Sequence, residues 1–191
     1  HSEGVGGGMS VVGSQLTLED CTFDLNDSDG GAGGLHVGNA DVAISNTTFR
    51  QNLAQDSGGG LRLDSATGLV CRCDFADNIA VDQGGGIRVT GSGSNVTIAE
   101  STFRRNDSDY GTAVDIGSVV HVLVEDCDFE DNFGPAINKF EFGQITIDSC
   151  RFREDHPTND HAHVVNVGRN STSFIKDSSF IECTARPLRV G

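Results

Sequence analysis

A phenylalanine motif recurs along the whole chain at a nearly constant spacing. Each copy consists of a small residue, any residue and then Phe, and successive phenylalanines lie 26, 26, 28, 26, 23 and 28 residues apart. Such a period is typical of solenoids, in which each repeat is one structural unit that stacks on the next. The phenylalanines of the motif are Phe23, Phe49, Phe75, Phe103, Phe129, Phe152 and Phe180.

Two further motifs keep the same phase. A glycine-rich segment opens an alternating strand, as at 58–61 (GGGL) and 84–87 (GGGI), and a second alternating strand precedes each Phe. Alternation with period two indicates β-strands, and no helical period is long enough for an ordinary helix. We therefore predict an all-β fold, a single-stranded right-handed parallel β-helix of about seven coils with about 26 residues and three short strands per coil.

Stacking predicts two structural columns. The phenylalanines should form one column inside the coils. In five repeats an asparagine follows three residues after Phe, at a turn where Asn tolerates a left-handed backbone and its amide can bond the same amide one coil away. We interpret these asparagines as a structural ladder rather than a binding site: Asn26, Asn52, Asn78, Asn106 and Asn132.

With these motifs in place, the chain resembles the repeat region of the chlamydial polymorphic outer membrane proteins, whose repeats carry GGA[ILV] and FxxN. Here FxxN occurs five times, while the glycine motif reads GGGM, GGL, GGGL and GGGI. The resemblance implies a secreted or surface-exposed β-helix used for adhesion or as a stalk. The wider right-handed β-helix group also includes polysaccharide lyases, hydrolases and epimerases, so the fold alone does not choose a function.

We expect residues 1–191 to form one β-helix domain without evident caps. The glycine-rich motif begins within a few residues of the N-terminus, and its degraded copies continue to Leu188. Open solenoid ends call for caps, flanking domains or another copy, and a head-to-tail contact between copies gives a filament. The expected partners are therefore the chain itself, stacked head to tail, or flanking domains of a longer stalk.

Charge excludes two classes of partner. The 13 Lys and Arg against 28 Asp and Glu give a net charge of −15, which repels nucleic acids and anionic membrane surfaces. No apolar stretch approaches the ~20 residues of a spanning helix, so we predict no membrane insertion.

Cysteines and glycosylation sequons are candidate sites of covalent modification. Cys127 and Cys150 occupy the same slot in adjacent coils, where both a disulfide and two free thiols are open, and the lack of a CxxC pair argues against structural zinc. Three of the five Asn-x-Ser/Thr sequons should face outward, whereas the other two belong to the ladder. The outward sequons are Asn46, Asn95 and Asn170, and the ladder sequons are Asn26 and Asn106.

Acidic turns at 27–29 and 107–109 have the composition of calcium ligands. Lying three coils apart, they cannot share one ion. We interpret them mainly as solubilising turns, with Ca²⁺ as the alternative and no other cofactor or metal expected.

Two groups of residues could carry chemistry. One lies where a turn has expanded, and its histidines and carboxylates could bind a metal or serve as acid and base on a uronic acid: Asp155, His156, Asp160, His161 and His163. The other is an outward column that could bind an anionic sugar: His36, Arg62 and Arg88.

These observations favour a secreted or cell-surface structural or adhesive β-helix without catalytic activity. The alternative is a carbohydrate-active enzyme or sugar-binding module of the polyuronate lyase or epimerase type, with a surface polysaccharide as its ligand.

Overall fold

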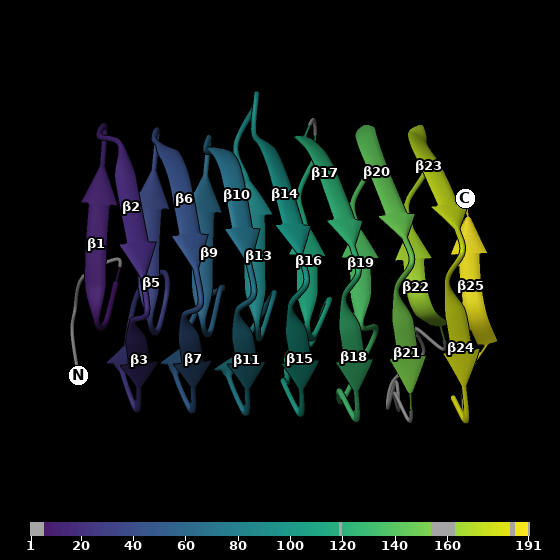
Figure 1. The fold of residues 1–191 in the computed structure, drawn as a ribbon, viewed down its shortest axis with the longest axis horizontal. Coiled ribbons are helices and arrows are strands. Elements are labelled where there is room, and N and C mark those ends of the chain that lie inside the picture. The colour runs from purple at the N-terminus through teal and green to yellow at the C-terminus, as the bar shows by residue number, and fades with distance from the viewer. Residues whose placement is uncertain (1–5, 119, 154–162, 184–185, 191) are drawn as a thin grey trace.

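The chain winds as a parallel solenoid in which each strand pairs with its counterpart in the next coil (Figure 1). The computed structural model describes residues 6–118, 120–153, 163–183 and 186–190. Within these ranges the regular structure is β-strand, and no helix is long and apolar enough to cross a membrane. The predicted all-β parallel fold, with about 26 residues per coil, is confirmed.

Three main sheets run the length of the solenoid, one per side of the coil. Sheet A contains β1 (Met9–Val12), β5 (Leu35–Gly38), β9 (Leu61–Asp64), β13 (Ile87–Thr90), β16 (Val114–Ile116), β19 (Ile137–Lys139), β22 (His163–Val167) and β25 (Arg186–Val190). Sheet B contains β2 (Leu16–Glu19), β6 (Asp41–Ser45), β10 (Thr67–Cys71), β14 (Asn95–Ala99), β17 (Val120–Glu125), β20 (Gly143–Asp148) and β23 (Ser171–Lys176). Sheet C contains β3 (Thr22–Asp24), β7 (Thr48–Arg50), β11 (Asp74–Ala76), β15 (Thr102–Arg104), β18 (Asp128–Glu130), β21 (Arg151–Arg153) and β24 (Ser179–Ile181).

A fourth, short sheet was not predicted. It pairs two-residue strands that follow sheet C in three successive coils, namely β4 (Asp27–Ser28), β8 (Leu53–Ala54) and β12 (Ile79–Ala80). Strands this short leave no alternation in the sequence, so only the stacking of the coils reveals them.

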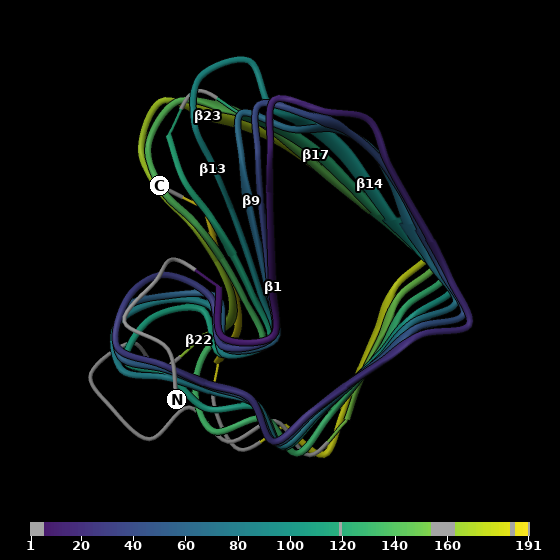
Figure 2. The same ribbon diagram turned by 90° about the vertical axis from the view of Figure 1, so that its left-hand side faces the viewer.

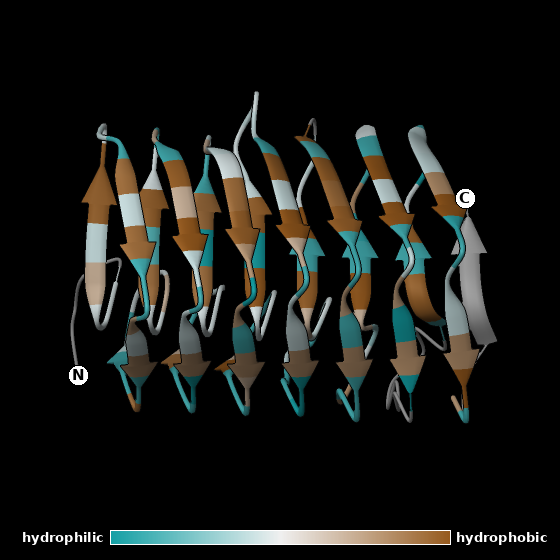
Figure 3. Cartoon of the chain, viewed as in Figure 1, coloured by the Kyte–Doolittle hydropathy of each residue, from teal (hydrophilic) through white to brown (hydrophobic). Residues whose placement is uncertain are grey.

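Identical side chains stack inside the coils. The rings of the phenylalanine column are nearly parallel, with centroids 4.7–5.0 Å apart, and the rings from Phe49 to Phe152 are buried. Apolar positions of sheets A and B fill the rest of the core, so apolar and polar residues alternate along the strands (Figure 3). Since one coil is too thin to bury these side chains alone, the stack is the unit of stability.

The asparagine ladder joins the coils at the end of sheet C. Asn78 donates from Nδ2 to Asn106 Oδ1 (3.1 Å) and to the Phe49 carbonyl (2.9 Å), and its own Oδ1 accepts from Asn52. One expectation about this turn was wrong. The left-handed conformation falls on the residue before each asparagine, as at Asp77 (φ 57°) and Arg105 (φ 49°).

Candidate functional site

A row of polar side chains runs along the outer face of sheet A, the side that Figure 2 shows between two outward-curving sets of turns. Strand pairing places its members in register, one per coil. They point outward because their neighbours along each strand, such as Leu61 and Leu63 on either side of Arg62, point into the core. We call them the polar row: Ser10, His36, Arg62, Arg88, Asp115, Asn138 and Asn166.

Asp64 organises the N-terminal part of this row. His36 Nε2 lies 3.1 Å from Asp64 Oδ2, and Arg62 Nε donates to both carboxylate oxygens at 3.0 and 3.2 Å. Burial raises the pKa of Asp64, but the hydrogen bond from His36 and the charge of Arg62 outweigh it and leave the pKa below its usual value. Arg62 also contacts Asp56 at 2.7 Å.

A buried ion pair continues the row. The Arg88 guanidinium contacts the Asp115 carboxylate, whose side chain is fully buried. The turn at Gly111 (φ 59°) covers it, since a Cβ there would lie 2.7 Å from Asp115 Cβ. Burial and the nearby charge of Arg62 lower the pKa of Arg88 to about 10. The predicted His36, Arg62 and Arg88 column is thus real, but both of its arginines are paired with aspartates.

Toward the C-terminus, the members of the polar row are asparagines instead of charged residues. Asn138 Nδ2 donates to Asp115 Oδ1 (2.7 Å), and Asn166 Nδ2 donates to Asn138 Oδ1 (2.8 Å). The chain of hydrogen bonds that starts at the buried carboxylate therefore ends at a half-buried amide on the surface.

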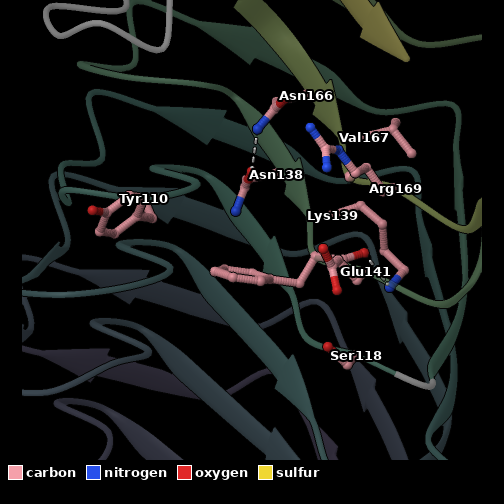
Figure 4. A pocket seen from close by; sticks show the side chains of 10 residues that line it. Tyr110, Ser118, Asn138, Lys139, Glu141, Asn166, Val167 and Arg169 are labelled. Carbon is pink, nitrogen blue, oxygen red and sulfur yellow. Dashed lines mark hydrogen bonds between the residues drawn. The ribbon is translucent and has the colours of Figure 1, made fainter. Parts of the chain in front are cut away.

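This end of the row lines a groove of about 550 Å³ (Figure 4). Tyr110 and Phe140 contribute aromatic rings that are 38% and 39% exposed. Glu141 and Arg169 add one charge of each sign. A concave site with aromatic walls and a few polar groups is typical of small-molecule and sugar-unit binding.

A buried lysine holds the turn beside the groove in place. Lys139 occupies an inward position of β19, and its Nζ donates to the carbonyl oxygens of Gly117 (2.7 Å), Phe140 (3.0 Å) and Phe142 (2.6 Å). These contacts fix the turn that carries the Phe140 ring. Burial, with a contribution from the charge of Arg88, lowers the pKa of Lys139 to about 8.

Most of the predicted histidine cluster lies outside the described residues: Asp155, His156, Asp160 and His161. His163 begins β22 and is half-buried. Among the described residues no group of three His, Cys, Asp or Glu side chains is placed to hold a metal ion. The acidic turns at 27–29 and 107–109, for which calcium binding was the alternative interpretation, form no such group within the described ranges.

The five sequons divide by exposure. Asn46, Asn95 and Asn170 are exposed. Asn26 and Asn106 donate from Nδ2, the atom that would carry a glycan, to the next amide of the ladder. Outward glycosylation stays a prediction for the three exposed asparagines.

Cys127 and Cys150 are buried free thiols in adjacent coils. Each donates to the carbonyl of the residue two positions earlier, Glu125 (3.2 Å) and Asp148 (3.3 Å). Ser101 uses the same slot to bond the corresponding carbonyl at 2.7 Å, so the thiols fill a position that hydroxyls fill elsewhere. Contact with Cys150 and burial raise the pKa of the Cys127 thiol. The two cysteines are free thiols in this structure, and a disulfide between them stays the untested alternative.

Sequence reasoning missed the groove and the carboxylates that pair with the arginines. Asp115 stands on a degraded copy of the repeat, and the segment with Phe140 and Arg169 follows no motif. The only signal was the loss of the glycine motif after 86, which marks coils whose turns differ from the rest.

The comparisons agree with this architecture. Residues 33–187 match a family described as a right handed beta helix region. The chain matches no curated protein and no solved structure. Since the match covers most of the sequence, the chain belongs to the right-handed β-helix family.

Proposed function

We propose that this β-helix is an adhesive scaffold, secreted or displayed at a cell surface, whose groove binds a neutral polysaccharide. The observation that carries the proposal is the joining of two exposed aromatic rings to a chain of amides in one groove. Aromatic faces pack against the C–H faces of sugars, while amides donate to and accept from hydroxyl groups.

The charges of the groove and of the adjoining polar row favour a neutral ligand, because Glu141 and Arg169 in the groove are of opposite sign. Arg62 and Arg88, the cations expected to neutralise a uronate, already face Asp64 and Asp115. Lys139 directs its ammonium group to three carbonyls. A net charge of −15 adds long-range repulsion of a polyanion.

The repeated interior supports the proposed scaffold role. Five fully buried phenylalanines and the asparagine ladder hold the coils in one register and support a rigid surface on which the groove sits. Head-to-tail stacking, flanking domains and the uronate-processing alternative stay predictions.

A glycan array followed by calorimetry tests the proposal. We expect binding to neutral polysaccharides and weaker or no binding to polyuronates. Tyr110→Ala should weaken the affinity roughly tenfold, as is common for aromatic anchors. Phe174→Ala is the matched control, because Phe174 is also exposed but lies on sheet B away from the groove.

Two results would contradict the proposal. One is tighter binding of polyuronates than of neutral glycans. The other is an equal loss of affinity in Tyr110→Ala and Phe174→Ala.

A further inference from the structure

The N-terminal end of the polar row joins a serine, a histidine and an aspartate by hydrogen bonds. Ser10 Oγ lies 3.1 Å from His36 Nδ1, and His36 Nε2 lies 3.1 Å from Asp64 Oδ2. The three residues come from β1, β5 and β9, so the stacking of three coils brings them together. No motif in the sequence marks this set.

The hydrogen bonds prepare His36 to act as a base toward Ser10. The Asp64 carboxylate accepts the proton-bearing Nε2–H, which leaves the lone pair of Nδ1 facing the serine hydroxyl. Arg62 Nε donates to both Asp64 oxygens and fixes the carboxylate. Nucleophile, base and positioning carboxylate thus stand in the order that activates a serine, with the two ring nitrogens exchanged relative to the usual hydrolase arrangement.

Exposure fits this assignment. Ser10 is exposed, so a substrate can reach its Oγ, whereas His36 is only 7% exposed and its ring is held in place. Val12, two residues along the same strand and on the same face, is 58% exposed. This small apolar surface suits a short acyl chain rather than a long one.

We propose that Ser10, His36 and Asp64 hydrolyse carboxylic esters of short acyl groups. Ser10 Oγ attacks the carbonyl carbon while its proton moves to His36 Nδ1. The ester C–O bond then breaks, and the alcohol leaves with that proton. Water attacks the acyl-serine, gives a proton to Nδ1, and the carboxylic acid departs as the proton returns to Ser10 Oγ.

In this reaction Ser10 and His36 are catalytic residues, and Asp64 is a positioning residue. The proposal does not depend on glycan binding, because it involves the opposite end of the polar row and a separate substrate.

A fluorophosphonate probe and p-nitrophenyl acetate test the proposal on the 191-residue chain. Peptide mapping should find the phosphonate on Ser10, and Ser10→Ala should lose it. His36→Gln should slow labelling roughly a hundredfold, the usual contribution of a general base. Ser14→Ala, which removes an exposed serine of the same coil, should change nothing.

Asp64→Asn separates catalysis from structure. We expect kcat for p-nitrophenyl acetate to fall while KM stays unchanged, because the carboxylate acts through His36. Circular dichroism would verify that each variant is folded. Wild-type protein that carries no phosphonate on Ser10 overturns the proposal without reference to any variant, as does equal labelling in a folded His36→Gln protein.

Discussion

The two faces of sheet A obey different rules. One column of its inward positions repeats an apolar side chain from coil to coil: Leu35, Leu61, Ile87, Val114, Ile137 and Val165. The other inward column is interrupted by the buried Lys139. The outward positions of the sheet change from serine to histidine, arginine, aspartate and asparagine within the same length. An inward side chain packs against the equivalent side chains of the neighbouring coils, so a residue type that packs well recurs from coil to coil. An outward side chain meets turns, solvent or a ligand, so departures from the repeat show where function is to be sought.

The largest effect should come from the phenylalanine column. Phe103 is fully buried, with stacked rings 4.9 Å away on both sides. Phe103→Ala should lower the free energy of unfolding by about 3–5 kcal/mol, measured by urea denaturation. A loss no greater than that of the exposed Phe174→Ala would mean that the inward column does not hold the fold.

The buried ion pair of the polar row should come next. Asp115→Ala leaves the Arg88 guanidinium and the Asn138 amide without their acceptor, and we expect a loss of about 3 kcal/mol. The double variant Arg88→Met/Asp115→Leu should recover most of this loss, because a well-packed apolar pair can replace a buried ion pair. Failure to recover would show that the outer face is as constrained as the core.

An interruption of the asparagine ladder should have a smaller effect. Asn78→Ala removes the acceptor of Asn52 Nδ2 and a donor to the Phe49 carbonyl, both of which are buried. We expect a loss of about 2 kcal/mol in the same denaturation experiment. Asn95→Ala, at an exposed strand position without a left-handed backbone, is the control, and similar losses in both variants would remove the distinction between inner and outer asparagines.

A further effect should appear as a dependence of stability on pH. The pKa of Lys139 is lowered to about 8, so the unfolded chain binds more protons than the folded chain between about pH 8 and the ordinary lysine value of 10.5. The free energy of unfolding should therefore rise with pH across this window, and Lys139→Met should remove this contribution to the slope. An identical slope in both proteins would indicate that the three carbonyl contacts offset the effect of burial.

The sequence was sufficient to predict the fold because a motif that repeats once per coil can bury its side chains only when the coils stack in the same register. Phe75 contacts Phe49 and Phe103 in this way. The sequence could also align His36, Arg62 and Arg88. It could not reveal that Asp64 and Asp115 neutralise these residues, because pairing depends on the side-chain conformations of the arginines and the histidine, which the spacing of the repeat does not determine. The groove escaped prediction because Phe140 and Arg169 belong to turns that follow no motif.

The central claim is that the repeated interior stabilises the molecule while the irregular face binds its ligand. Phe129→Ala and Phe140→Ala test it most directly, because one ring is fully buried in the column and the other is 39% exposed in the groove. Urea denaturation and glycan titration of both variants should show that Phe129→Ala loses about 3–5 kcal/mol of stability but binds normally when folded. Phe140→Ala should stay within about 1 kcal/mol of the original stability and lose roughly tenfold in affinity. Equal losses of stability in the two variants, or normal binding by Phe140→Ala, would contradict the account.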